Sequence, residues 1–360
     1  MGQSFTFRAD ASGEIGFGHL RRCLTLAGAA ARRGHAVTFL LSDLSGSGAA
    51  EMAGALAGKV ERIGGGGRPA GEIAALAGAE VSRSDVMVTD IAHPLVLAER
   101  QRLPELLRRL HESTGHLVVI EGLGGDSIAA ECDGIAELLI TPYAVAEATQ
   151  ERPQKTRRLV GAEFAILAPG YREMAGQDRE IAEAARRILI TPGGADPTEA
   201  ALQIVAACEE LRPAPLELHV VVGPFFSSAL RRALAAAAER SVHAVSLIEA
   251  PEDLRAEMLW CDLAIATSGL TKYELAATGT PTVLLSHDAA HAKNNEAFAA
   301  LGTSLDLGEA SRLSSSAISE AVSGLLQDSA GREEMSRRGR ATVDGAGVER
   351  IIDVIEEMTA

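Results

Sequence analysis

Short apolar runs alternate with longer alanine-rich stretches along almost the whole chain. The short runs are rich in valine, isoleucine and leucine and predict buried β-strands. The longer stretches space their apolar residues by three or four positions and predict helices. Strands that alternate with helices in this way form parallel sheets covered by helices on both faces. The expected strands cover residues 5–9, 37–41, 86–89, 117–120, 138–141, 188–191, 216–222, 244–248, 263–266 and 282–285.

The alternation of strands and helices occurs twice, and a chain of 360 residues is longer than one hydrophobic core usually supports. We therefore expect an α/β protein with two Rossmann-like domains, each a doubly wound parallel sheet, over residues 1–168 and 169–360. The boundary lies near Pro169-Gly170, and a charged helix is expected after it over 172–187. Other expected helices cover 199–211, 227–238 and, near the end of the chain, 348–358.

Composition and charge narrow the possible functions. The hydrophobic fraction of 47% and the charged fraction of 23% are those of an ordinary folded protein. A formal net charge of −15 argues against nucleic acid as a partner, because binding to it needs a basic surface. No apolar stretch approaches the ~18 residues of a membrane span, and no signal peptide is evident. The cysteines are far apart, which is typical of reduced thiols, so we expect a cytoplasmic protein.

The first candidate for chemistry is a glycine turn after the first strand, Gly13-x-x-Gly16-x-Gly18-His19. Its glycine spacing differs from the dinucleotide-binding fingerprint, so NAD binding is not expected. His19 stands where a helix begins, and two roles are open to it. It caps its own helix, or it is a general base with a pKa near ~6.5. We predict His19 as catalytic, together with Asp10 at the end of the preceding strand.

A second glycine turn follows the strand over 188–191. Gly193 and Gly194 lie in this turn, and Asp196 or Thr198 is placed to cap the next helix. Such glycines are often only part of the turn between a strand and a helix. Alternatively, their exposed backbone N–H groups bind a diphosphate.

A third turn, Thr267-Ser268-Gly269-Leu270-Thr271, follows the strand over 263–266. Ser268, Gly269 and Thr271 offer donors to phosphate oxygens, and Leu270 lies in the same turn. Glu274 is either the partner of Thr271 in a capping box or a carboxylate that binds the two hydroxyls of a ribose. Both interpretations remain open from the sequence.

A dense set of polar residues follows the strand over 282–285. His287 and His291 are considered as a metal pair, but no third ligand follows at a useful spacing and no acidic DxD-like cluster is present. We therefore expect no metal and no cofactor. Asn294 and Asn295 are predicted to contact the substrate.

Three segments together resemble a known family, the UDP-sugar hydrolases of pseudaminic acid biosynthesis and the related spore-coat polysaccharide proteins. The segments are Gly16-Phe-Gly18-His19-Leu-Arg-Arg22-Cys23-Leu24, Thr191-Pro-Gly193-Gly194-Ala-Asp196-Pro197 and Ser268-Gly269-Leu-Thr271-Lys272-Tyr273-Glu274. Residues 159–169 also resemble the segment that precedes the second domain in that family. The likeness is patchy and extends from about Arg8 to Gly308.

The resemblance implies a GT-B architecture, with a nucleotide sugar in the cleft between two Rossmann-like domains. It implies that His19 activates water at the anomeric carbon and that the second domain binds UDP. The diphosphate would contact Ser268 and Gly269, and the uridine portion would contact Glu274. The full predicted sets are Gly18, Gly193, Gly194, Ser268, Gly269, Leu270, Thr271 and Glu274 for the nucleotide, and Arg22, Asp90, Asn294 and Asn295 for the sugar.

Two segments of the first half depart from the family pattern. These are Asp90-Ile-Ala-His93-Pro94 and the stretch 120–126, and both lie on the side expected to bind the sugar or an acceptor. The leading interpretation is hydrolysis of a UDP-amino sugar by water. The alternative is a GT-B glycosyltransferase with a sugar acceptor, in which His19 or Asp90 is the base. A third possibility is a protein that binds sugar nucleotides without turnover.

Overall fold

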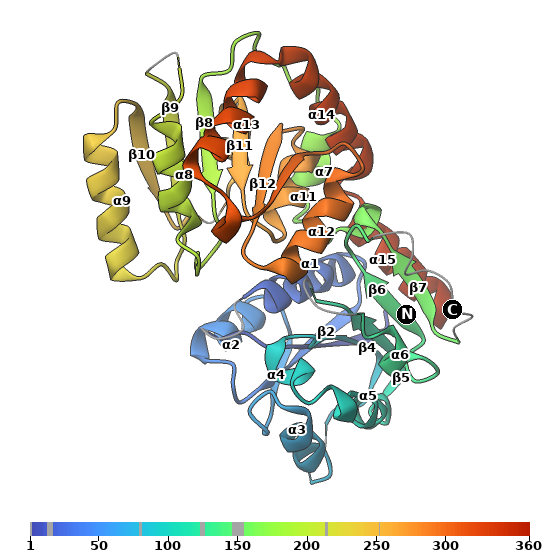
Figure 1. Ribbon diagram of the computed structural model, residues 1–360. Helices are drawn as coiled ribbons and strands as arrows, with labels where there is room; N and C mark the ends of the chain where they lie inside the picture. Colours follow the sequence, from blue (N-terminus) through green and yellow to red (C-terminus); the bar gives the residue numbers. More distant parts are fainter. Residues whose placement is uncertain are drawn as a thin grey trace. The chain divides into compact units, whose positions relative to one another are not determined.

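The computed structural model describes residues 2–12, 17–78, 81–122, 127–145, 155–212, 215–251 and 253–360. The chain forms two compact units (Figure 1). The first unit runs to Leu167 and also contains Ala346–Ala360, and the second unit is Ala168–Gly345. The last fifteen residues therefore belong to the first unit, whereas the expectation of a domain over 169–360 assigned them to the second.

The first unit is built on a seven-stranded parallel sheet with the order β3-β2-β1-β4-β5-β6-β7. Its strands are β1 (Ser4–Ala9), β2 (Ala36–Ser42), β3 (Lys59–Ile63), β4 (Ser84–Asp90), β5 (Thr114–Ile120), β6 (Leu138–Thr141) and β7 (Arg157–Val160). Its helices are α1 (Gly18–Arg32), α2 (Ser47–Gly54), α3 (Pro69–Leu76), α4 (Pro94–Leu97), α5 (Leu103–His111), α6 (Ala129–Cys132) and α15 (Gly347–Thr359), with 3-10 turns at Arg100–Arg102 and Ala162–Phe164.

Both faces of this sheet are buried because successive strand residues point to opposite sides. On one side, Phe7 and Phe39 pack with residues of α1 and α15 such as Leu20 and Ile351. On the other side, neighbouring strand residues such as Met87 pack with the leucines of α5. The helix expected over 348–358 is confirmed as α15.

The second unit contains a six-stranded parallel sheet with the order β10-β9-β8-β11-β12-β13. Its strands are β8 (Arg187–Thr191), β9 (Glu217–Val222), β10 (Ala244–Glu249), β11 (Leu263–Ala266), β12 (Thr282–Ser286) and β13 (Leu305–Glu309). Its helices are α7 (Gly170–Ala175), α8 (Ala200–Cys208), α9 (Ser228–Arg240), α10 (Arg255–Trp260), α11 (Thr271–Ala277), α12 (Ala289–Ala299), α13 (Ser315–Gln327) and α14 (Ser329–Thr342), with a 3-10 turn at Ala310–Arg312.

The strand order places the predicted motifs. In the first unit β1 lies between β2 and β4, and in the second unit β8 lies between β9 and β11. The chain reverses its direction of travel across each sheet at these points, and the carboxyl ends of the two central strands are where open α/β sheets bind ligands. The segments after β1 and β4, and those after β8 and β11, are the ones that carry the polar and glycine-rich motifs.

All strands expected from the sequence are present, with small shifts of their ends, but three further strands were missed. The missed strands are β3, β7 and β13, and each forms an edge of its sheet. Edge strands are partly exposed and carry charged residues, as in Lys59-Val-Glu61 and Arg157-Arg158. Their sequences therefore lack the apolar run that marks a central strand.

The charged helix expected over 172–187 is wrong, because helix α7 ends at Ala175. The segment after α7 is not helical, and arginine side chains connect it to backbone oxygens. Arg179 donates to the carbonyl of Met258 at 2.8 Å and to the Thr280 hydroxyl at 3.0 Å. Arg332 donates to the carbonyl of Ala182 in the same segment. These tertiary contacts override the helical pattern of the sequence.

All four cysteines are buried free thiols. None of the helices in the described ranges combines the length and apolarity needed to cross a membrane.

Candidate active site

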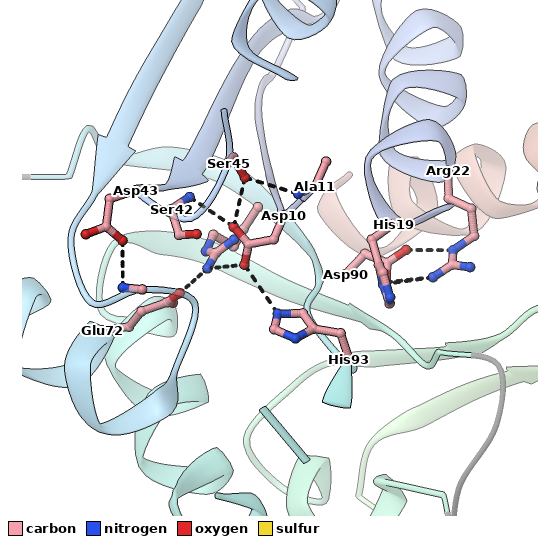
Figure 2. Close-up of polar contacts among 12 residues, drawn as sticks. Asp10, Ala11, His19, Arg22, Ser42, Asp43, Ser45, Glu72, Asp90 and His93 are labelled. Atoms are coloured by element: carbon pink, nitrogen blue, oxygen red, sulfur yellow. Dashed lines mark hydrogen bonds and ion pairs between the residues drawn. The ribbon is translucent and has the colours of Figure 1, made fainter. Parts of the chain in front are cut away.

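His19 lies in the first turn of α1 and faces the end of strand β4 (Figure 2). Its Nδ1 is 2.6 Å from Oδ1 of Asp90, the last residue of that strand. Arg22, one turn further along α1, donates to both oxygens of the same carboxylate, from Nε at 2.7 Å and from Nη2 at 2.9 Å. Asp90 is fully buried, whereas 12% of the His19 side chain is exposed. The result is a buried carboxylate that orients a partly accessible imidazole.

This geometry excludes one of the two roles open to His19, and the role of general base stays a prediction. The N-cap of α1 is Phe17, and the helix has no side-chain cap, so His19 does not cap its own helix. The ionised Asp90 carboxylate can only accept a hydrogen bond, so the 2.6 Å contact assigns the imidazole proton to Nδ1 and leaves Nε2 as the basic nitrogen, although Arg22 Nη2 also lies 3.0 Å from Nδ1. Burial lowers the pKa of His19 below its usual value, although Asp90 opposes this shift. The imidazole is therefore mainly neutral at pH 7, which is the state a general base needs.

The pKa of Asp90 lies below its usual value. Burial alone would raise it, but the positive charge of Arg22 and the contact with His19 outweigh that effect. Arg22 also lies beside an aromatic ring, with its guanidinium carbon 5.9 Å from the centre of Tyr143. Asp90 and Arg22 were both predicted as sugar-binding residues. The structure instead engages both side chains with each other and with His19.

A second buried histidine lies close to the first and was missed by the sequence analysis. His93 Nε2 is 3.4 Å from Oδ2 of Asp10, and the rings of His93 and His19 meet edge to face with centres 5.8 Å apart (Figure 2). Asp10 is fully buried and also accepts from the backbone N–H of Ser42 at 3.1 Å. Asp10, predicted as catalytic with His19, thus contacts the neighbouring imidazole.

Asp10 belongs to a buried ionic cluster at the ends of β1 and β4. Arg8 lies 2.9 Å from Oδ2 of Asp10 and donates to Glu72 of α3. Burial and then Asp10 raise the pKa of Glu72, although Arg8 opposes this, and the pKa of Asp10 is well below its usual range because Arg8 and His93 outweigh its own burial. A charged residue such as Arg8 within an apolar strand is the sequence feature that marks this cluster, because an arginine is rarely buried without a partner.

Glycine is required beside the His19 ring. A Cβ atom on Gly122, after strand β5, would lie 2.3 Å from the carbonyl oxygen of Ala92 and 3.5 Å from Cε1 of His19. The backbone at Gly122 therefore approaches the Ala92 carbonyl as closely as only glycine allows, whereas the His19 ring lies at ordinary contact distance from the same position. This observation gives a physical reason for the first glycine in the segment that departs from the family pattern. Residues 123–126 of that segment, and Gly13 and Gly16 of the first motif, lie outside the described residues.

In the second unit, the turn after β8 brings two glycines against a third. Gly193 has a φ of +95°, which favours glycine. A Cβ atom on Gly223 would lie 2.3 Å from the carbonyl oxygen of Gly194 and 2.6 Å from that of Gly193. The N-cap of α8 is Glu199, not Asp196 or Thr198, but Asp196 accepts from the backbone N–H groups of Ala200 and Ala201 in the first turn of the helix. The turn is thus packed closely against the backbone of Gly223.

The turn after β11 is open at its glycine. Gly269 has a φ of +137°, and a Cβ atom placed on it would have no atom within 4 Å. Leu270 is the N-cap of α11 and Thr271 is its first residue, and this helix has no side-chain cap. The capping-box interpretation of Glu274 is therefore wrong. Glu274 lies beside Tyr171, whose pKa is raised by burial and by this carboxylate.

Asn294 and Asn295, predicted to bind the sugar, surround a buried lysine. Lys272 of α11 is 1% exposed and donates to Oδ1 of both residues, at 2.8 Å for Asn295. Asn295 is itself fully buried, and its amide nitrogen is 3.2 Å from Oγ of Ser268. Burial lowers the pKa of Lys272 to about 7, with Asp306 opposing the shift. Asn295 is thus a buried residue that donates to the side chain of Ser268.

The two histidines after β12 have separate partners. His287 Nδ1 lies 2.9 Å from the Thr198 hydroxyl, and His291 pairs with Asp288, the N-cap of α12. Among the residues that the structure describes, no group of three histidine, cysteine or acidic side chains is arranged to hold a metal ion.

The sequence of the chain was compared with those of known proteins. No protein-family model matches the chain. The spore coat polysaccharide biosynthesis protein SpsG of Bacillus subtilis (strain 168) is 26% identical over 261 residues, which are 71% of this chain and 73% of SpsG. The chain is a distant homologue of SpsG.

Solved structures match over nearly the full length. MurG of Acinetobacter baumannii superposes with a TM-score of 0.69 at 14% identity, covering 99% of this chain and all of MurG. The glycotransferase of kitacinnamycin gives 0.69 at 16% identity with complete coverage of both chains. CalG4, the calicheamicin glycosyltransferase, gives 0.63 at 18% identity and covers 99% of this chain and 98% of its own. The expected GT-B fold is confirmed.

Proposed function

We propose that this protein is an enzyme that cleaves the anomeric C–O bond of a nucleotide sugar, with a UDP-amino sugar as the leading substrate. The observation that carries the proposal is the Asp90–His19 pair at the carboxyl edge of the first sheet, with a contact of 2.6 Å and a partly exposed imidazole. Distant homology to SpsG supports a role in the synthesis of a surface polysaccharide, and a nonulosonic acid of the pseudaminic type is proposed from the resemblance of the sequence motifs alone.

In the proposed step, Nε2 of His19 accepts a proton from water while the water oxygen attacks the anomeric carbon. The bond between that carbon and the diphosphate oxygen breaks, and its electron pair leaves with UDP. The leaving diphosphate is already a stable anion, so the step needs no strong general acid. Asp90 stabilises the imidazolium that forms, because a buried carboxylate interacts strongly with a nearby positive charge.

The second unit supplies the groups proposed to bind UDP. The turns that hold Gly193 and Gly269 lie at the carboxyl ends of adjacent strands, β8 and β11, where backbone N–H groups bind phosphates in related sheets. Ser268 and Thr271 add hydroxyl donors, and Glu274 is proposed to accept from the ribose hydroxyls. Two proteins of the same fold have been solved in complex with UDP-sugars, HepE of Anabaena with UDP-glucose and UGT2 of Phytolacca americana with UDP-2-fluoroglucose.

The experiment is to incubate the protein with UDP-N-acetylated amino sugars in the absence of any acceptor and to measure release of UDP. We expect release by the wild type and its loss in His19→Ala. His111→Ala is the matched control, because His111 is a half-exposed residue of the same unit that pairs with Glu137. Full activity of His19→Ala would contradict the assigned base.

Transfer to a sugar acceptor is the second candidate. It is favoured by the position of His93, which belongs to a segment that departs from the hydrolase pattern and has its ring 5.8 Å from that of His19. In this case UDP would be released only after an acceptor hydroxyl is supplied. The same assay with and without oligosaccharide acceptors therefore separates transfer from hydrolysis.

A further inference from the structure

Lys272 is a cation buried in the second unit with few polar contacts. Its amine lies 5.3 Å from the ring centre of Tyr273 and 5.6 Å from that of Phe298. It donates to the side-chain oxygens of Asn294 and Asn295. Burying an ammonium group is unfavourable unless its donors are used, so a lysine at this position needs a reason.

The lysine fixes the orientation of the Asn295 amide. Below its pKa of about 7, Lys272 carries an ammonium group that only donates, so the Asn295 atom facing it is the acceptor Oδ1. The two protons of the Asn295 NH2 group are then shared among three acceptors, the carbonyl of Leu285 at 3.1 Å, Oγ of Ser286 at 2.9 Å and Oγ of Ser268 at 3.2 Å. A flipped amide would place two donors against each other at Lys272.

The fixed amide in turn decides the role of Ser268. Its Oγ accepts from Asn295, so its own hydroxyl proton is free to donate in another direction. In the part of the chain that the structure describes, the Ser268 hydroxyl has no acceptor of its own. The next residue, Gly269, borders open space. A hydroxyl proton beside open space is suited to donate to an anionic oxygen of a ligand.

We propose that Lys272 and Asn295 are positioning residues that commit the Ser268 hydroxyl to donate to the diphosphate of the bound nucleotide. The proposal rests on the proposed function, because it assumes that the turn after β11 binds the diphosphate. In this directed chain of donors, Lys272 donates to Asn295, Asn295 donates to Ser268, and Ser268 donates to the diphosphate.

The sharpest variant is Asn295→Asp, which keeps the shape of the side chain. The carboxylate still accepts from Lys272, but the oxygen that replaces the amide nitrogen can no longer donate and faces the carbonyl oxygen of Leu285, so thermal melting is measured first to show that the variant is folded. The Ser268 hydroxyl would then donate to this oxygen and be lost to the ligand. A hydrogen bond to a charged group is worth enough that we expect about a tenfold to hundredfold weaker UDP affinity by calorimetry.

The added negative charge of Asn295→Asp would also repel a diphosphate, and Ser268→Ala separates the two causes. If the hydroxyl is the link, Ser268→Ala alone weakens UDP binding by a similar factor, and the double variant is about as weak as either single one. If Asn295→Asp weakens binding equally with and without the Ser268 hydroxyl, the repulsion explains the loss and the proposal is overturned.

A second pair of variants tests the first link. Lys272→Met removes the donor that fixes the amide and should weaken UDP affinity by about tenfold while thermal melting shows a folded protein. Lys293→Met is the matched control, since Lys293 is exposed on helix α12, and its UDP affinity should equal that of the wild type.

The outcomes distinguish this proposal from the proposed function. A wild-type protein that binds neither UDP nor any other nucleoside diphosphate overturns both. A wild type that binds UDP, with folded Lys272→Met and Asn295→Asp variants that bind it equally well, overturns only the directed chain of donors.

Discussion

The carboxyl edges of the two sheets differ in the kind of polar group that they bury. In the first unit the edge holds ionisable side chains in contact. Asp90 contacts His19 and Arg22 (Figure 2), and Arg8 contacts Asp10 and Glu72. In the second unit the corresponding edge holds glycine turns, hydroxyls and amides, with one buried amine below them.

The difference indicates that the two edges have different roles. Ionised groups buried in contact have shifted pKa values and suit proton transfer, whereas glycine backbone and neutral donors suit an anion that arrives with its own charge. We therefore interpret the first edge as the source of the base and the second as the binding site of the leaving diphosphate. The predictions below test this contrast, from the largest expected effect to the smallest.

The largest effect is expected from Asp90→Asn. An amide at this position can donate to Nδ1 of His19, which would place the imidazole proton on Nε2 and remove the base. We expect kcat to fall by about a hundredfold or more, with UDP affinity nearly unchanged. Steady-state kinetics together with calorimetry measure both quantities, and an equal loss in both would mean that Asp90 supports binding instead.

A large loss of stability is expected from Arg8→Met in the same edge. The variant leaves Asp10 buried without its ionic partner, which typically costs about 3–5 kcal/mol in the free energy of unfolding. Urea unfolding followed by circular dichroism measures the change. Arg102→Met is the control, because Arg102 is 46% exposed and its contact to Glu105 is a surface pair. A similar small change in both variants would show that the buried cluster contributes little.

The sequence predicted the second edge more fully than the first. Glycines with turn residues after a strand mark Gly193 and Gly269 directly, because local backbone geometry requires them there. His19 was found for the same reason. His93 and Glu72 come from other elements, and only the tertiary fold brings them to Asp10 and His19.

The roles assigned to carboxylates and amides were harder to infer for a related reason. Asp90 and Asn295 were predicted to touch the sugar, yet each is fully buried against a neighbouring side chain. A polar residue after a strand looks the same in sequence whether it faces a ligand or supports the residue that does. The edge strands β3, β7 and β13 were missed because partial exposure leaves them without an apolar pattern.

A moderate effect is expected from pH on stability through Lys272. Its pKa is about 7 in the folded protein, against 10.5 for an unperturbed lysine. Between these values the unfolded chain binds more protons, so the free energy of unfolding rises with pH, by at most about 1.4 kcal/mol per pH unit. Lys272→Met lacks this contribution. Urea unfolding from about pH 7 to pH 10 should show the wild type gaining stability relative to Lys272→Met, and parallel curves would contradict the lowered pKa.

The smallest effect concerns the pH at which the rate declines as His19 becomes protonated. His19 acts as a base only when neutral, and burial lowers its pKa below 6.5. The decline of kcat/KM toward low pH should therefore have its midpoint below pH 6.5, because kcat/KM reports the pKa of the free enzyme. A midpoint above pH 6.5 would indicate a different base or a raised pKa.

The central claim is that the first edge supplies the base and the second edge binds the diphosphate. Its most direct test is a calorimetric titration of UDP into two variants side by side. His19→Ala should bind UDP as tightly as the wild type, because the base belongs to the first edge. Ser268→Ala should bind about tenfold more weakly, because its hydroxyl belongs to the second. The opposite result, with UDP binding lost in His19→Ala and intact in Ser268→Ala, would contradict the account.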